Sequence, residues 1–105
     1  MVLQRHRCGL IYTQAFADYL DARQGLEGDD HPDDVLSLDY IRCATGPQAG
    51  TSWCQLTWIP SVSIPLTDRF QFGSTLLHIH KQTRNGLKTR GLDYDPEKDS
   101  LRILS

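Results

Sequence analysis

The sequence lacks long apolar runs and a large excess of one charge, and each absence excludes a class of protein. No apolar stretch approaches the about 20 residues that cross a bilayer, so we expect no membrane span. The N-terminal segment is polar and has no apolar core, so we expect no secretory signal there. Eleven lysines and arginines against thirteen aspartates and glutamates leave a net charge of -2. That balance excludes a strongly basic nucleic-acid binder on bulk charge, though not a local basic patch.

Cysteine is also scarce and unpaired. Cys8, Cys43 and Cys54 are odd in number, widely spaced and without a CxxC motif, which indicates a reducing compartment. Pairing of one of these thiols with His6 or His31 is the pattern that nucleophilic catalysis would need. Each cysteine instead lies in or beside an apolar strand pattern, so we interpret all three as small packing residues. We therefore expect no enzyme activity.

Length and composition favour one small folded domain. The chain has 105 residues, of which 39% are hydrophobic and 23% are charged. These values are typical of a globular protein and not of a disordered one. We expect a single domain over residues 1–105.

Short β-rich segments separated by turn residues dominate the chain. Alternating or apolar β-formers predict strands over residues 8–13, 35–44, 52–59, 69–72, 75–81, 87–93 and 101–104. Residues 13–24 have apolar side chains at helical spacing and suggest one short helix ending near Gly25. Asn85-Gly86 is the strongest hairpin signal, and Asp95-Pro96-Glu97 predicts a second turn. The fold class that this pattern predicts is mainly all-β: a small antiparallel β-barrel or sandwich with long loops, with the barrel as the expectation for the domain.

Charge is unevenly distributed along the chain. Residues 1–40 carry a balance of -5 and residues 41–105 a balance of +3. The acids concentrate in a predicted loop, at Glu27, Asp29, Asp30, Asp33 and Asp34. The bases concentrate on the predicted 81–90 hairpin, at Lys81, Arg84, Lys88 and Arg90. An acidic loop and a basic hairpin on one chain are able to bind copies of the chain head to side, but charge alone favours the alternative of two solvated loops that never meet.

His78 and His80 are the one candidate for a metal site. Residues i and i+2 of a strand point to the same side, so both imidazoles are placed to share a metal ion. No spacing supplies the further ligands that such a site needs. The glycines at 46, 50 and 73 match no phosphate-binding loop. We therefore expect no cofactor, and we interpret the two histidines as side chains on the solvent face of a strand.

Several weak motifs follow one another along the chain in a definite order. Arg5-His6-Arg7 precedes a short strand at Gly9-Leu10-Ile11-Tyr12, and a variable stretch rich in Asp and Gly follows. Ile41-Arg42-Cys43 comes before a turn that contains Gly46 and Gly50. The second half has Pro60, then Asp68-Arg69 leading into a strand and Gly73, and a closing strand over residues 101–104. In the order and spacing of these motifs, and most of all in its second half, the chain resembles the head–tail joining proteins of tailed bacteriophages, also called head-closure or stopper proteins.

The resemblance implies a structural virion protein and no catalysis. Copies would form a closed ring at the neck, below the portal and adaptor proteins, after assembly in the host cytoplasm. The ring would seal the DNA-filled head, let packaged DNA pass through its channel, and present a platform to tail proteins. The acidic loop of one subunit would then meet the basic hairpin of the next subunit or ring. The alternative is an accessory β-barrel that binds nucleic acid or a host protein through residues 81–90.

Overall fold

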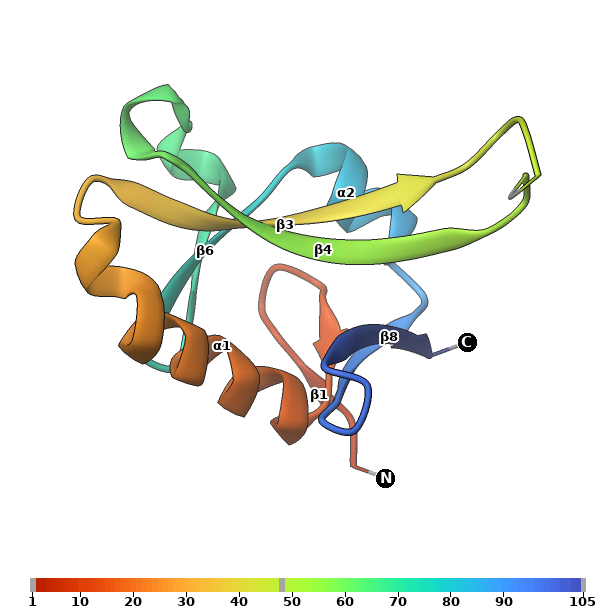
Figure 1. The fold of residues 1–105 in the computed structure, drawn as a ribbon, viewed down its shortest axis with the longest axis horizontal. Coiled ribbons are helices and arrows are strands. Elements are labelled where there is room, and N and C mark those ends of the chain that lie inside the picture. Colours follow the sequence, from red (N-terminus) through yellow and green to blue (C-terminus); the bar gives the residue numbers. More distant parts are fainter. Residues whose placement is uncertain (1, 48, 105) are drawn as a thin grey trace.

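The longest feature of the computed structural model is the hairpin of strands β3 (Asp34–Arg42) and β4 (Ser52–Pro60), which crosses the molecule in Figure 1. The structure describes residues 2–47 and 49–104. The N-terminal half also contains β1 (Gln4–Arg5), β2 (Ile11–Tyr12), α1 (Gln14–Glu27) and η1 (Gly28–Asp30). The second half contains η2 (Ser61–Ser63), η3 (Leu66–Asp68), β5 (Arg69–Phe72), β6 (Thr75–Ile79), α2 (Lys81–Gly86), β7 (Gly91–Asp95) and β8 (Ser100–Leu104).

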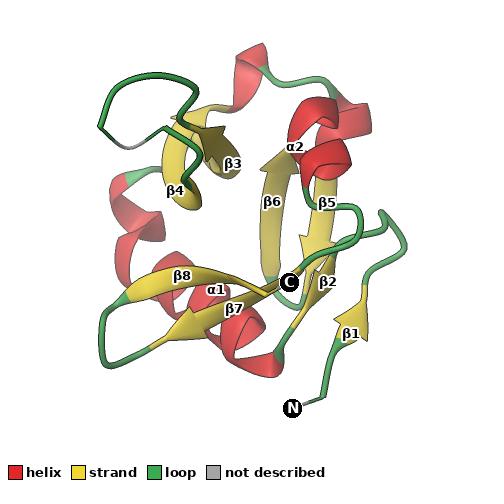
Figure 2. Cartoon of the chain, turned by 90° about the vertical axis from the view of Figure 1, so that its right-hand side faces the viewer, coloured by secondary structure: helices red, strands yellow, loops and turns green. Residues whose placement is uncertain are grey.

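The strands form two four-stranded sheets, in the orders β1-β2-β7-β8 and β4-β3-β6-β5. The predicted mostly-β fold is confirmed, and its arrangement is sandwich-like. The expectation of a closed, antiparallel barrel was wrong in two respects. Each sheet contains one parallel pair, β2 with β7 and β3 with β6. The edge strands β4 and β8 lie close to each other, yet no ladder joins them within residues 2–47 and 49–104. Figure 2 shows β7 and β8 lying below β3, β4 and β6.

Helix α1 begins where a side-chain cap and an apolar face coincide. The Thr13 hydroxyl accepts a hydrogen bond from the backbone N–H of Phe16 (3.3 Å), which satisfies one of the unpaired donors of the first turn. Phe16 and Leu20 are fully buried on the face that packs against the sheets. The helix passes the predicted stop near Gly25 and ends at Glu27, and η1 follows it, so the first part of the predicted acidic loop is helical.

The Asn85-Gly86 hairpin predicted from the sequence was wrong, because these residues close the helix α2. His80 precedes that helix, and its ring accepts a hydrogen bond from the backbone N–H of Gln82 (3.2 Å). The predicted partner, β6, already has β3 and β5 as neighbours on its two sides. No edge of β6 is therefore open to a returning strand. The following strand, β7, pairs with β2 and β8 instead.

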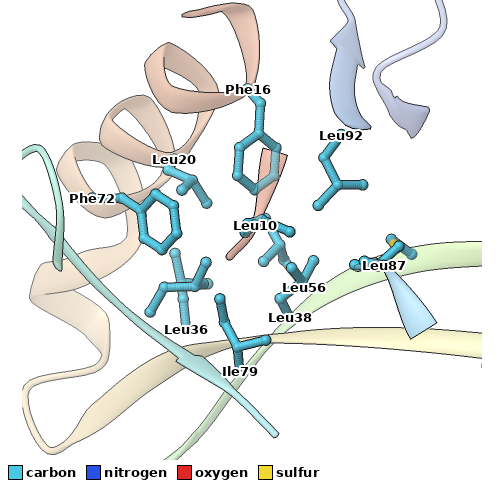
Figure 3. Packing of buried hydrophobic residues seen from close by; sticks show 12 residues of the cluster. Leu10, Phe16, Leu20, Leu36, Leu38, Leu56, Phe72, Ile79, Leu87 and Leu92 are labelled. Carbon is cyan, nitrogen blue, oxygen red and sulfur yellow. The ribbon is translucent and has the colours of Figure 1, made fainter. Parts of the chain in front are cut away.

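One apolar cluster joins α1 to both sheets, as Figure 3 shows. Its fully buried members include Phe16, Leu20, Leu36, Leu38, Leu77, Ile79, Leu87 and Leu92. On β3 the residues Val35 to Leu38 are all buried. Alternation along β3 places Leu36 and Leu38 in the cluster, and Val35 and Ser37 on the opposite face are buried as well.

His6 ties one edge of the first sheet to the second. Its ring stacks on Phe72 with 4.1 Å between ring centroids. Its Nε2 donates to the carbonyl oxygen of Gln71 (2.7 Å), and its Nδ1 accepts from the backbone N–H of Cys8 (3.1 Å). Both ring nitrogens are thus used in holding β5 near the β1–β2 connection.

Candidate binding surfaces

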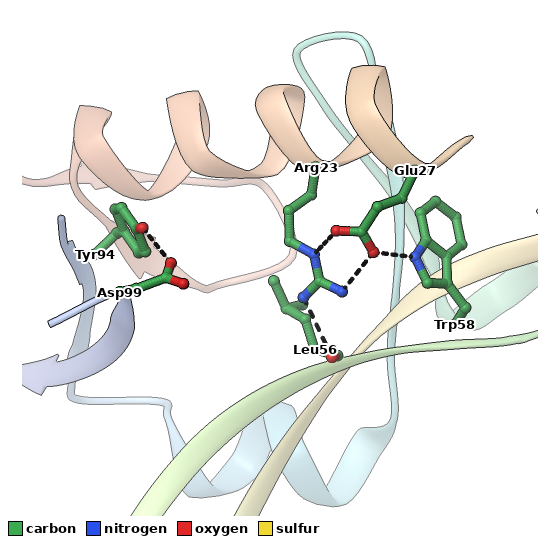
Figure 4. A network of polar contacts seen from close by, with 6 residues as sticks. All are labelled: Arg23, Glu27, Leu56, Trp58, Tyr94 and Asp99. Atoms are coloured by element: carbon green, nitrogen blue, oxygen red, sulfur yellow. Dashed lines mark hydrogen bonds and ion pairs between the residues drawn. The ribbon is translucent and has the colours of Figure 1, made fainter. Parts of the chain in front are cut away.

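Two of the five acids that the sequence singled out are held by neighbouring side chains. Arg23 donates two hydrogen bonds to Glu27, each 3.0 Å long, and the Trp58 indole donates a third at 2.9 Å (Figure 4). The bonds from Arg23, and then from Trp58, lower the pKa of Glu27. Asp34 lies 2.9 Å from Nδ1 of His31. Both carboxylates therefore help to hold α1 and its following turn in place.

The other three acids form an exposed acidic turn, defined here as Asp29, Asp30 and Asp33. Asp29 and Asp30 lie in η1, and Asp33 immediately precedes β3. No ion pair of these three carboxylates occurs in the part of the chain that the structure describes. Their charge is thus available to a partner.

Two of the four cations of the predicted basic hairpin are likewise held by side chains of the fold. Arg84 pairs with Asp68 (3.2 Å) and lies 5.0 Å from the Phe70 ring centroid. Arg90 donates to the hydroxyl of Tyr40 (2.9 Å). Lys81 and Lys88 are exposed, and within residues 2–47 and 49–104 neither forms an ion pair.

The exposed acidic turn and the two exposed lysines lie apart in the fold. The turn follows the end of α1, whereas Lys81 begins α2 and Lys88 comes just after it. Figures 1 and 2 both place the end of α1 and helix α2 at separate parts of the molecule. The two charged surfaces do not meet within one copy, so any contact between them joins different copies.

The two candidate metal ligands have separate environments. His78 is buried on β6, and its Nδ1 has no hydrogen-bond partner. His80 is exposed and uses its ring at the start of α2. The interpretation of both as solvent-face residues was therefore wrong for His78. Among the described residues, no group of three or more His, Cys, Asp or Glu is placed to hold a metal ion.

Burial of His78 predicts a loss of stability on mild acidification. Desolvation is the main cause that lowers its pKa from the usual 6.5, with the charges of Asp68 and Asp39 opposing it. The unfolded chain therefore takes up this proton first as the pH falls, and folding stability decreases below about pH 6.5. We expect the free energy of unfolding of His78→Gln to vary less between about pH 7.5 and 5.5 than that of the wild type. Urea unfolding at several pH values measures this; equal slopes in the two proteins would contradict it.

The three cysteines are free thiols in different environments, and Cys54 is buried. Burial is the main cause that raises the pKa of Cys54 to about 12, so its thiol stays protonated and is a poor nucleophile near neutral pH. Cys8 packs against the core, and the Cys43 thiol donates to the carbonyl of Thr45 (3.0 Å). The predicted packing role is confirmed for Cys54 and Cys8.

The structure also contains an apolar groove that the sequence analysis missed. One cavity of about 480 Å³ lies between α1 and the β7–β8 turn. It is lined by Ala15, Asp18, Tyr19, Ala22, Arg23, Leu26, Tyr94, Pro96 and Asp99. A second cavity, of about 300 Å³, shares Tyr19 and Asp99 with the first and continues between β4 and β8 past Trp53. We call the two cavities together the tyrosine groove.

Two stacked rings form the centre of the tyrosine groove. The centroids of Tyr19 and Tyr94 are 3.9 Å apart, and the ring planes differ by 9°. The Tyr94 hydroxyl donates to Asp99 (2.5 Å), a contact drawn in Figure 4. This hydrogen bond is the main cause that raises the pKa of Tyr94 to about 12, so the hydroxyl remains a donor. Only the helical spacing of Ala15, Tyr19 and Ala22 marked part of this surface in the sequence.

Comparison with known proteins assigns this chain to no family. No protein-family model, curated protein or solved structure matches this chain. In the part of the chain that the structure describes, no helix has the length and apolar character that crossing a membrane requires.

Proposed function

We propose that the protein is a structural subunit that works by associating with copies of itself and with neighbouring proteins, without catalysing a reaction. The head–tail joining proteins of tailed phages are the proposed class, in which a ring of copies closes the filled head and meets the tail. The observation that carries the proposal is the separation of the exposed acidic turn from Lys81 and Lys88 on one small β-rich subunit.

Separated surfaces of opposite charge favour a head-to-side contact. When one surface of a subunit binds a different surface of the next, repetition gives a ring if the rotation closes and a filament if it does not. Charge complementarity speeds association and sets the register of the contact. The described strands form two separate sheets and not the closed barrel that the strand pattern predicted, so the proposal depends on the charge arrangement and on the resemblance in motif order.

A charge-swap experiment tests the contact between copies. Lys81→Glu with Lys88→Glu reverses one surface, and Asp29→Lys with Asp30→Lys reverses the other. We expect each double variant alone to self-associate at least about tenfold more weakly than the wild type, because attraction becomes repulsion at several positions. An equimolar mixture of the two variants restores opposite charges and should restore association. Sedimentation velocity at low and high salt measures both effects.

Matched variants separate assembly from folding. Lys98→Glu reverses an exposed lysine on the β7–β8 turn and should leave association unchanged. Arg84 is unsuitable for this purpose, since its pair with Asp68 belongs to the fold. A monomeric wild type at high concentration, or mixtures that associate no better than the single variants, would exclude this contact.

The neck assignment needs its own measurement. Tailed particles from a phage that encodes this chain should contain it in a fixed small multiple, located at the neck by electron microscopy. Absence from such particles would exclude the phage proposal. The charge-swap experiment would then test only whether copies of the chain associate.

The nucleic-acid alternative now depends on fewer cations. Arg84 and Arg90 are used within the fold, which leaves Lys81 and Lys88 to contact phosphates. A salt-dependent gel shift with short DNA, lost in the Lys81→Glu and Lys88→Glu double variant, would favour this alternative.

A further inference from the structure

The lining of the tyrosine groove is mostly apolar, and its rim carries two acidic side chains whose charges no described cation neutralises. Ala22 and Leu26 expose apolar surface along α1, with Leu26 82% exposed. Pro96 forms part of the opposite wall, on the β7–β8 turn. Arg23 is the one cation among the lining residues, and Glu27 neutralises it through two hydrogen bonds.

The two acids of the rim have polar partners but no cation. Asp18 accepts a hydrogen bond from the amide of Gln14 (2.9 Å), and Asp99 accepts one from Tyr94 (2.5 Å). Neither carboxylate forms an ion pair with another described residue. Neutralisation of Arg23 by Glu27 therefore leaves a net negative field over the tyrosine groove, which favours a ligand with positive charge.

The backbone of Asp99 adopts an uncommon left-handed conformation. Asp99 has φ of 48°, and no other non-glycine residue among those described has a positive φ. L-residues adopt this left-handed region at some cost, and Asp and Asn tolerate it better than most. The turn thus holds this carboxylate at the junction of the two cavities in an uncommon conformation.

We propose that the tyrosine groove binds an extended, proline-rich segment of another protein that carries a lysine or arginine beside its prolines. Aromatic-lined grooves recognise the polyproline II helix, whose conformation is set before binding and therefore loses little entropy. That helix has three residues per turn and rises about 3.1 Å per residue, so apolar residues three apart lie about 9 Å from each other on one side. Two such residues would occupy the two cavities, both of which Tyr19 lines, and the basic residue would face Asp18 or Asp99.

This occupant fits the groove better than an added strand. The only strand that lines the larger cavity is β7, through Tyr94, and β7 is already paired with β2 and β8 on its two sides. The edges of β4 and β8 bound the smaller cavity alone, so a ladder formed there would leave the larger cavity empty. The extended segment exposes its own carbonyl groups, because polyproline II has no internal hydrogen bonds. The residues that line the groove include neither the exposed acidic turn nor Lys81 or Lys88. The inference therefore goes beyond the proposed function and is tested separately.

Titration with a synthetic peptide tests the inference. The probe is Ala-Pro-Pro-Leu-Pro-Pro-Arg-Pro-Ala with blocked ends, added to the full chain and followed by tryptophan fluorescence and by the NMR shift of the Trp53 indole. We expect saturable binding that weakens with salt. Asp18→Asn and Asp99→Asn should each weaken binding by about fivefold, since each removes one charge while keeping a hydrogen-bond acceptor. Ala22→Gln places a longer side chain in the groove and should reduce binding by at least about tenfold.

Controls make each outcome decisive. Glu97→Gln removes an exposed acid from the same turn that does not line the groove, and it should leave binding unchanged. A second peptide with Glu in place of Arg should bind markedly more weakly. Equal binding of the two peptides, equal losses in Glu97→Gln and Asp99→Asn, or no binding at millimolar peptide would overturn the proposal. Self-association of the wild type that Ala22→Gln abolishes would assign the groove to a second copy and would also overturn it.

Discussion

Replacement of Phe16 by alanine is expected to lower the free energy of unfolding by about 3–5 kcal/mol, the largest effect of any single substitution that we predict. Phe16 is fully buried on α1 and packs edge-on to Phe72, with 6.5 Å between ring centroids. Truncation removes its apolar surface from the core and leaves a cavity between α1 and the sheets. Urea or guanidinium unfolding followed by circular dichroism measures the change.

A matched substitution on the same helix controls for helix propensity. Leu26→Ala changes a residue that is 82% exposed and should cost less than about 0.5 kcal/mol. Because small domains are stable by only about 5–15 kcal/mol, Phe16→Leu provides a milder variant that keeps the chain folded. Comparable losses in Leu26→Ala and Phe16→Ala would contradict the packing that Figure 3 shows.

Asp93→Asn is expected to give the second largest effect, a loss of about 2–3 kcal/mol near neutral pH. The Asp93 carboxylate is buried and accepts hydrogen bonds of 2.6 Å from both Thr13 and Arg102. Thr13 in turn caps α1, so this carboxylate links the start of the helix to β7 and β8. The substitution removes the charge that strengthens both bonds.

The effect of Asp93→Asn should depend on pH with a definite sign. The hydrogen bond from Thr13 is the main cause that lowers the pKa of Asp93 from its usual 3.8, and Arg102 adds to the shift. A carboxylate with a lowered pKa stabilises the fold at pH values above its unfolded pKa, and this stabilisation is lost as the pH falls through the folded pKa. The difference between wild type and variant should therefore be full near pH 7 and should shrink below about pH 4. A difference that stays constant from neutral to strongly acidic pH would show that the charge of Asp93 contributes nothing.

Local patterns predicted the longest strands well, because burial of alternate residues leaves a signal within each segment. The predicted 35–44, 52–59 and 69–72 strands correspond closely to β3, β4 and β5. The predicted 8–13 strand is reduced to β2 at Ile11–Tyr12, and the predicted 87–93 strand begins only at Gly91. The turn at Asp95-Pro96-Glu97 joins β7 and β8 as expected, and the closing strand lies at the predicted place. The helix at α1 was found by its spacing but was longer than expected, since Gly25 lies within it.

The sequence contains no comparable local signal for which strands pair with each other or for which charged side chains form ion pairs. Asn85-Gly86 is as compatible with a helix end as with a hairpin, and only the occupation of both sides of β6 excludes the hairpin. In the same way, Arg84 and Lys88 look alike in sequence. The presence of Asp68 and Phe70 beside Arg84 is what separates a structural cation from an exposed one.

The sequence by itself determined that this is a small, mostly-β chain, the positions of its longest strands, and the uneven distribution of its charges. Tertiary structure decided which of those charges are exposed, which strands pair so that β4 and β8 remain at the edges of separate sheets, and how Tyr19 comes to lie beside both Tyr94 and Trp53. The physical reason is one of range. Alternation and capping act between near neighbours, whereas a groove or an ion pair is made by segments that only the packed core brings into contact.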